Sequence, residues 1–129
     1  MNRLEVEVTK IEEVDRLHYL TLSLNKKVIH MLTLELSKNI KVGKNVNISI
    51  KSTNIGISKT LKKDISIENQ LKSKVIHIEN GKILSSICLN IEGFKLESII
   101  SLDACKRLNL KVDDEVFALL SESAVSIVG

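Results

Sequence analysis

Three histidines and two cysteines are the side chains of this chain whose types suit metal ligation or nucleophilic chemistry. His18, His30 and His77 have no pairing with Cys or carboxylates at the short spacings that zinc sites use. Cys88 and Cys105 form no CxxC motif, and the sequence has no GxGxxG segment, no GxSxG segment and no phosphate-cradling loop. We therefore expect no catalysis, no bound metal cation and two reduced, structural cysteines.

An internal repeat is the strongest pattern in the sequence. Residues 2–11 align with residues 69–78 at an offset of 67, and share an Asn, a Leu, a Val and the final Ile. Near the ends of the copies, residues 50–57 align with residues 120–127 at an offset of 70, so the first copy lacks three residues midway. Self-similarity at a fixed offset predicts two copies of one structural module.

Alternating apolar and polar residues predict about five half-buried strands in each copy. The alternation is clear at residues 4–8, 20–24, 46–50 and 83–91. Turn signals stand at Asn80-Gly81, at Glu92-Gly93 and at Asn25-Lys26-Lys27. The sequence therefore predicts antiparallel hairpins and an all-β fold.

One short helix is predicted within the second copy, at residues 101–108, with Ser101 at its N-cap. Its counterpart in the first copy spans at most one turn. The order strand, hairpin, strand, short helix, strand indicates a small closed or nearly closed barrel. We expect a first, abbreviated barrel at 1–58, a connector at 59–65 and a second barrel at 66–129.

Composition limits the classes of function. Modules of about 60 residues are marginal alone, which predicts that they pack together and that the chain forms a homo-oligomer. The 19 basic and 16 acidic residues are scattered and give a net charge of +3, so no extended basic face is expected. Residues 1–7 carry charges where a signal peptide needs an apolar core, and no apolar run is long enough to span a membrane. We expect a cytoplasmic protein that contacts neither nucleic acid nor membrane.

The second copy opens with Asn-Gln-Leu at residues 69–71 and closes with Leu-x-Leu-x-x-x-Asp-x-Val at residues 108–116. In this pattern, residues 66–129 resemble the Mop family of molybdate-binding domains, also called molbindins or TOBE domains. The resemblance implies tandem OB-like, five-stranded antiparallel barrels that bind molybdate or tungstate where copies meet. It also implies a role in storing, buffering or sensing the oxyanion, with a transporter or regulator as a further partner.

A buried dianion must be surrounded by donors, namely hydroxyls, N–H groups and a Lys or Arg. Among the family's ligating positions, Ser66 and Asn69 match the opening of the second copy, but Glu68 stands where the family has an Arg. Ser101 and Arg107 match the helical stretch. The next hydroxyl position of that stretch has become Ala104.

The family's last strand begins with a Lys, followed by Ala or Ser and by Ser or Thr. Lys51, Ser52 and Thr53 match this element in the first copy, whereas Ser121 takes the place of the Lys in the second copy. Each copy thus lacks some donors. We hypothesise composite sites that join the Lys-Ser-Thr element of one copy to the Ser and Arg of another copy's helical stretch across an interface.

Other interpretations of the same residues stay open. Ser66, Ser101 and Ser121 also fit as caps and strand-edge hydroxyls, and Asn2 and Asn69 as side chains that bond to the backbone at the start of a strand. The lost donors favour a structural or regulatory module whose anion site has decayed. An OB-type barrel that binds single-stranded nucleic acid is a third alternative, although three aromatic residues offer few platforms for base stacking.

Overall fold

The computed structural model describes residues 2–128 and confirms an all-β fold with five strands in each copy. The first copy contributes β1 (Asn2–Val14), β2 (Leu17–Leu24), β3 (Lys27–Thr33), β4 (Asn45–Ile50) and β5 (Ile55–Ser58). The second copy contributes β6 (Asn69–Asn80), β7 (Leu84–Ile91), β8 (Phe94–Ser101), β9 (Glu115–Leu120) and β10 (Ser126–Val128). The helical elements are α1 (Leu102–Leu108) and two short 3-10 turns, η1 (Ser52–Asn54) and η2 (Glu122–Ala124).

The period-two pattern of the sequence becomes the two faces of each sheet. Along β1, Leu4, Val6 and Val8 are buried while the residues between them are exposed. Beyond Val8 the register with β2 shifts by one residue, and the buried pattern of β1 ends there. The core is almost entirely Ile, Leu and Val, which pack well as β-branched and aliphatic side chains on a pleated surface.

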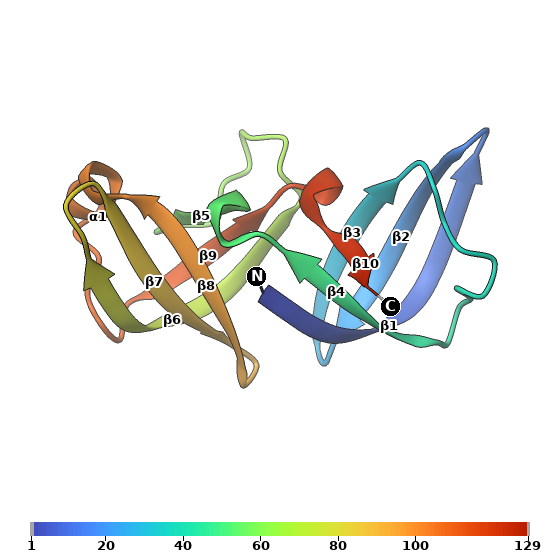
Figure 1. Cartoon of the computed structure of the whole chain (residues 1–129), viewed down its shortest axis with the longest axis horizontal. Coiled ribbons are helices and arrows are strands. Elements are labelled where there is room, and N and C mark those ends of the chain that lie inside the picture. The colour runs from blue at the N-terminus through green and yellow to red at the C-terminus, as the bar shows by residue number, and fades with distance from the viewer. Residues whose placement is uncertain (1, 129) are drawn as a thin grey trace.

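The two five-stranded sheets exchange their last strands. One sheet has the order β10-β4-β1-β2-β3 and the other the order β5-β9-β6-β7-β8. The first copy's β5 therefore pairs antiparallel with β9, and the second copy's β10 pairs antiparallel with β4. Figure 1 shows the two barrels side by side with these strands crossing between them. The limits 1–58, 59–65 and 66–129 remain a prediction about the sequence repeat, because neither sheet is built from one copy alone.

Of two predicted turns, one has the expected geometry and the other is longer than expected. Glu92 and Gly93 both have positive φ, 51° and 87°, and form a two-residue hairpin turn as expected. The Asn80-Gly81 signal also marks a turn, but the loop comprises residues 81–83 and Gly81 does not adopt positive φ. The longer loop has a structural use, since the Ile83 carbonyl accepts a hydrogen bond from Leu102 N–H at the start of α1 (2.9 Å).

The predicted helix is confirmed. Ser101 caps it, accepting a hydrogen bond from the Ala104 N–H at 3.0 Å, and Asn109 ends it in the left-handed conformation with φ of 51°. Cys105 is the buried residue of the helix, and both cysteines are free thiols. In the first copy the corresponding chain, residues 34–44, forms turns and no helix.

A hydrogen bond joins the two edges of the second barrel. Ser98 on β8 is fully buried, and its hydroxyl donates to the Ile55 carbonyl on β5 at 2.6 Å. These strands are the two edges of their sheet, so the bond brings the sheet close to a closed barrel. The offset of 67 places Met31 at the position of Ser98, and a Met side chain has no proton to donate.

Ser98→Ala is expected to lower the free energy of unfolding by about 1–2 kcal/mol, because the Ile55 carbonyl would stay buried without its partner. Urea denaturation followed by circular dichroism measures the change. Ser73→Ala is the matched control, since Ser73 is also buried and bonds only to the carbonyl of Leu71, two residues away at 2.8 Å. An equal loss in both variants would show that the bond between sheet edges has no special weight.

Candidate functional site

Two asparagines at equivalent positions of the repeat link the copies to each other. Asn69 is 1% exposed; its Oδ1 accepts from His30 N–H at 2.7 Å and its Nδ2 donates to His30 O at 2.8 Å. Asn2 binds Glu97 in the same way, with distances of 2.7 and 2.9 Å. In both cases the first residue of one copy's first strand holds the backbone of the other copy's third strand. The backbone-bonding interpretation of these asparagines is confirmed, and their partner lies in the opposite copy.

We call the contact of Asn2 with Glu97 the first junction, and we define it as Asn2, Lys51, Ser52, Ser86 and Glu97. The Glu97 carboxylate accepts a hydrogen bond from the Ser86 hydroxyl at 2.7 Å and one from the Ser52 hydroxyl at 2.9 Å. These bonds, in that order of weight, hold the pKa of Glu97 below its ordinary value against the opposing effect of partial burial. Lys51 precedes the buried Ser52 at the start of η1 and is exposed to solvent. The junction therefore contains an exposed lysine and a carboxylate that already accepts hydrogen bonds from two hydroxyls.

The equivalent contact, the second junction, is formed by Tyr19, His30, Glu68, Asn69 and Glu122. The Tyr19 hydroxyl donates to the Glu122 carboxylate at 3.1 Å, and its ring stacks on His30 with the ring centroids 5.4 Å apart. Desolvation first, then the hydrogen bond and charge of Glu122, raise the pKa of Tyr19 to about 12, and the charge of Glu68 acts in the same direction. This junction is rich in negative charge.

The two junctions are equivalent in backbone and opposite in chemistry. By the repeat, Ser121 occupies the position of Lys51 and Glu122 that of Ser52. A fully charged oxyanion is repelled by a carboxylate at about 5 Å with roughly 3 kcal/mol per unit charge at an effective dielectric of about 20. The second junction has two carboxylates and no lysine in these positions, so the first junction is the better anion site of the two.

The remaining predicted ligands are scattered within one chain. Ser66 and Thr53 are exposed, and the Ser121 hydroxyl lies 3.4 Å from the Ser123 hydroxyl. Ser101 already serves as the N-cap of α1, and Arg107 is exposed in its last turn. Figure 1 shows η1 in the middle of the molecule and α1 at the outer end of the second barrel. Within one chain these two elements do not meet, so any site that joins them requires a second chain.

Sequence reasoning missed Glu97, Ser86 and Glu122 at the junctions. Glu97 lies on β8, which contacts η1 of the other copy, and Glu122 lies on η2, which contacts β3 of the other copy. Ser86 joins the first junction only through its bond to Glu97, and none of these contacts is visible in an alternating pattern.

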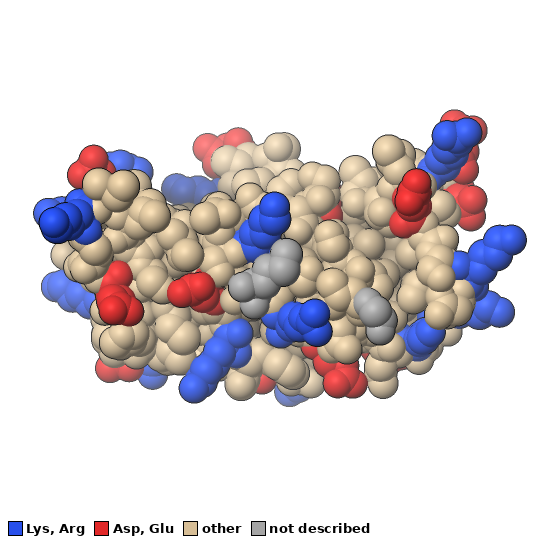
Figure 2. Space-filling view, viewed as in Figure 1, with Lys and Arg blue, Asp and Glu red and all other residues tan. Residues whose placement is uncertain are grey.

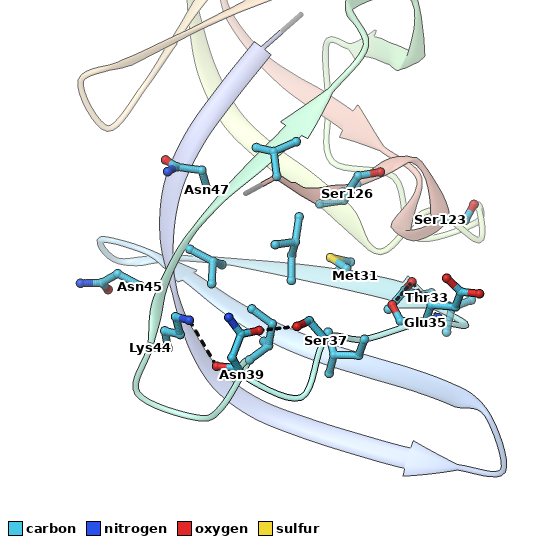
Figure 3. A pocket seen from close by; sticks show the side chains of 17 residues that line it. Met31, Thr33, Glu35, Ser37, Asn39, Lys44, Asn45, Asn47, Ser123 and Ser126 are labelled. Atoms are coloured by element: carbon cyan, nitrogen blue, oxygen red, sulfur yellow. Dashed lines mark hydrogen bonds between the residues drawn. The ribbon is translucent and has the colours of Figure 1, made fainter.

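A cavity of about 600 Å³ lies in the first barrel, between β3, β4, β10 and the loop at residues 34–44. Figure 3 shows Met31 between Ser126 on β10 and Ser37 on the loop. None of the eight predicted oxyanion ligands lines this cavity. The cavity is therefore a feature separate from the two junctions.

Residues 2–128 contain no cluster of three or more His, Cys, Asp or Glu side chains suited to a metal ion. In the same part of the chain, no helix combines the length and apolar character needed to cross a membrane. Tyr19 is stacked on His30, and Phe94 and Phe117 are half-buried, so these rings are not free platforms for nucleic-acid bases. On the face shown in Figure 2, Lys and Arg alternate with Asp and Glu and form no continuous basic surface.

Comparisons with known proteins agree with the fold and with the repeat. The TOBE domain matches residues 65–127. A probable molybdenum-pterin-binding protein of Haemophilus influenzae is 42% identical over 64 residues, which are 49% of this chain and 93% of that protein. Molybdenum-pterin-binding protein 1 of Clostridium pasteurianum is 40% identical over 65 residues, 50% of this chain and 96% of that protein.

Solved structures extend the likeness to both copies. The cytoplasmic molybdate-binding protein ModG, with molybdate bound, superposes with a TM-score of 0.90 over 98% of this chain and 94% of ModG, at 20% identity. A molybdate-binding protein from Sporomusa ovata matches with a TM-score of 0.50 at 27% identity, covering 51% of this chain and 98% of that one. The chain therefore belongs to the TOBE domain family, with two Mop-type copies of its OB-like fold in tandem.

Proposed function

We propose that this protein binds a tetrahedral oxyanion, molybdate or tungstate, in the cytoplasm and stores, buffers or senses it without catalysing a reaction. The observation that carries the proposal is the exposed Lys51 beside the hydroxyls of Ser52 and Thr53 at the first junction, in a chain of the TOBE family. The similar proteins support it, since they are named as molybdenum-pterin-binding and molybdate-binding proteins. A lysine and hydroxyls are the donors that a desolvated dianion requires.

The complete site is composite. Lys51, Ser52 and Thr53 supply one side, and Ser101 and Arg107 of a neighbouring chain supply the other, because α1 lies away from η1 within one chain. The protein therefore functions as a homo-oligomer, with a transporter or regulator as a further partner. Of the remaining predicted ligands, Asn69 has one amide proton left after its bond to His30.

We expect one oxyanion per chain, not two. The second junction, with Ser121 in place of the lysine and with Glu68 and Glu122 nearby, has lost its cations. Isothermal titration calorimetry with molybdate, tungstate and sulfate measures both the stoichiometry and the preference among the three anions. Two equal sites per chain would contradict the assignment of distinct roles to the junctions.

Lys51→Ala is expected to weaken molybdate binding by roughly tenfold to a hundredfold, because a hydrogen bond to a charged group contributes about 1.5–3 kcal/mol. The same calorimetric titration measures the change. Lys72→Ala is the matched control, since Lys72 is an exposed lysine on β6 that pairs only with Glu115 on the neighbouring strand. Equal affinities for the two variants would remove Lys51 from the site.

A structural or regulatory module with a decayed site is the second candidate. It is favoured by Ser52, whose hydroxyl proton is already donated to the Glu97 carboxylate within the chain. Thermal melting distinguishes the two, because a ligand that binds only the native state must raise the melting temperature. No shift with millimolar molybdate or tungstate would favour the structural module.

A further inference from the structure

The first barrel keeps an opening that the second barrel closes. Its two sheet edges are β3 and β10, and the 600 Å³ cavity lies between them beneath the loop at residues 34–44. In the second barrel, the corresponding edges are joined by the bond from Ser98 to Ile55. At the equivalent positions the first barrel has Met31 and Val125, and both line the cavity. The first barrel thus stays open because Met31 stands in place of Ser98 and cannot donate the hydrogen bond that joins the sheet edges.

The missing helix enlarges the opening. In the second copy, α1 and the residue after its cap bring Cys105 and Leu110 into the core, where they are 5% and 8% exposed. The first copy lacks three residues here, and its loop places only the half-buried Leu36 and Ile40 against the core. Both of these residues line the cavity.

The lining divides into an apolar floor and a polar rim. Met31, Val46 and Val125 form the floor and are 2–6% exposed. Lys44 on the rim donates one hydrogen bond, to the Asn39 carbonyl at 3.3 Å, and its ammonium group carries two more protons. Ser126 on β10 lies across the cavity from the loop (Figure 3), and Glu35 is the one acidic residue among the lining residues that the structure describes.

We propose that this cavity binds a small organic anion with an apolar body, whose charged group is held by Lys44. The volume lies within the range of about 300–1,000 Å³ that is typical of small-molecule sites, and it is much larger than a tetrahedral oxyanion needs. The apolar floor would pack against the body of the ligand. The lysine and hydroxyls of the rim would bind its charged group. This site is separate from the oxyanion site at the first junction.

Two fluorescent probes test the proposal on the full-length protein. One is 8-anilino-1-naphthalenesulfonate, which has a flat apolar body and a sulfonate, and the other is N-phenyl-1-naphthylamine, which has the same body without charge. We expect the sulfonate to bind at least fivefold more tightly than the neutral probe. Lys44→Ala should remove this preference, whereas Lys41→Ala, an exposed lysine in the same loop that does not line the cavity, should leave it unchanged.

Ile40→Trp should fill the cavity from the loop and weaken both probes at least tenfold, while a cooperative thermal melt shows that the fold is retained. If Lys44→Ala and Lys41→Ala behave alike, or if Ile40→Trp binds the probes as before, the proposal is wrong. Molybdate added to the probe complex should not release the probe. Release by molybdate would instead identify the cavity with the oxyanion site and would overturn the claim of a separate site.

Discussion

Replacing Asn69 by alanine is expected to lower the free energy of unfolding by about 2–4 kcal/mol. The side chain makes two short hydrogen bonds to His30, and the variant leaves both the N–H and the carbonyl of that residue without partners. The loss also falls on the contact between the copies. A module of about 60 residues has little stability of its own, so a weakened contact destabilises both barrels together.

Urea denaturation of the variant measures this loss. Asn90→Ala is the matched control, since Asn90 is also a strand asparagine but bonds only to Gly93 N–H in an exposed turn at 3.0 Å. Its loss should stay below about 1 kcal/mol. Asn2→Ala should resemble Asn69→Ala in direction, because Asn2 holds Glu97 in the same geometry. If Asn69→Ala is no worse than the turn variant, the asparagine contact does not stabilise the pair of barrels.

Much of the fold follows from local features of the sequence. Strand positions follow from period two, the helix from its Ser101 cap and the turn at Glu92-Gly93 from the glycine that positive φ requires. The exchange of β5 and β10 does not follow from these features. Both strands are short, with four and three residues, and nothing in their sequence marks which copy they join, so the choice depends on how the two copies pack together.

The candidate site was predictable only in part. The Lys51-Ser52-Thr53 element stands out in the sequence because its residue types match a family pattern, and the structure places it at a contact between copies. Glu97 matches no such family pattern. Its importance arises from the Ser52 hydroxyl 45 residues away, and such a pairing depends on tertiary structure that alternation and spacing do not encode.

Glu97→Gln is expected to tighten oxyanion binding at the first junction by roughly tenfold. A hydroxyl carries a single proton, and that of Ser52 is donated to the Glu97 carboxylate at 2.9 Å. A bound oxyanion must therefore either displace Glu97 or do without Ser52. Even at the dielectric of water, the Glu97 charge at about 5 Å repels a dianion by roughly 1.7 kcal/mol, which is somewhat more than tenfold in affinity.

Calorimetric titration of molybdate into the wild type, Glu97→Gln and the control Glu115→Gln tests this expectation. Glu115 is an exposed acid on β9 that pairs with Lys72 and bonds to no residue of the junction, so its variant reports the general effect of removing one negative charge. Selective tightening in Glu97→Gln would mean that Glu97 lowers the affinity of the wild type for molybdate. It would do so by accepting the proton of the Ser52 hydroxyl, which is a donor of the site. If the wild type binds molybdate and both variants match it, Glu97 lies too far from the bound anion to compete. If no variant binds, the first junction is a structural contact, in which Ser86 and Ser52 serve to hold Glu97 between the copies.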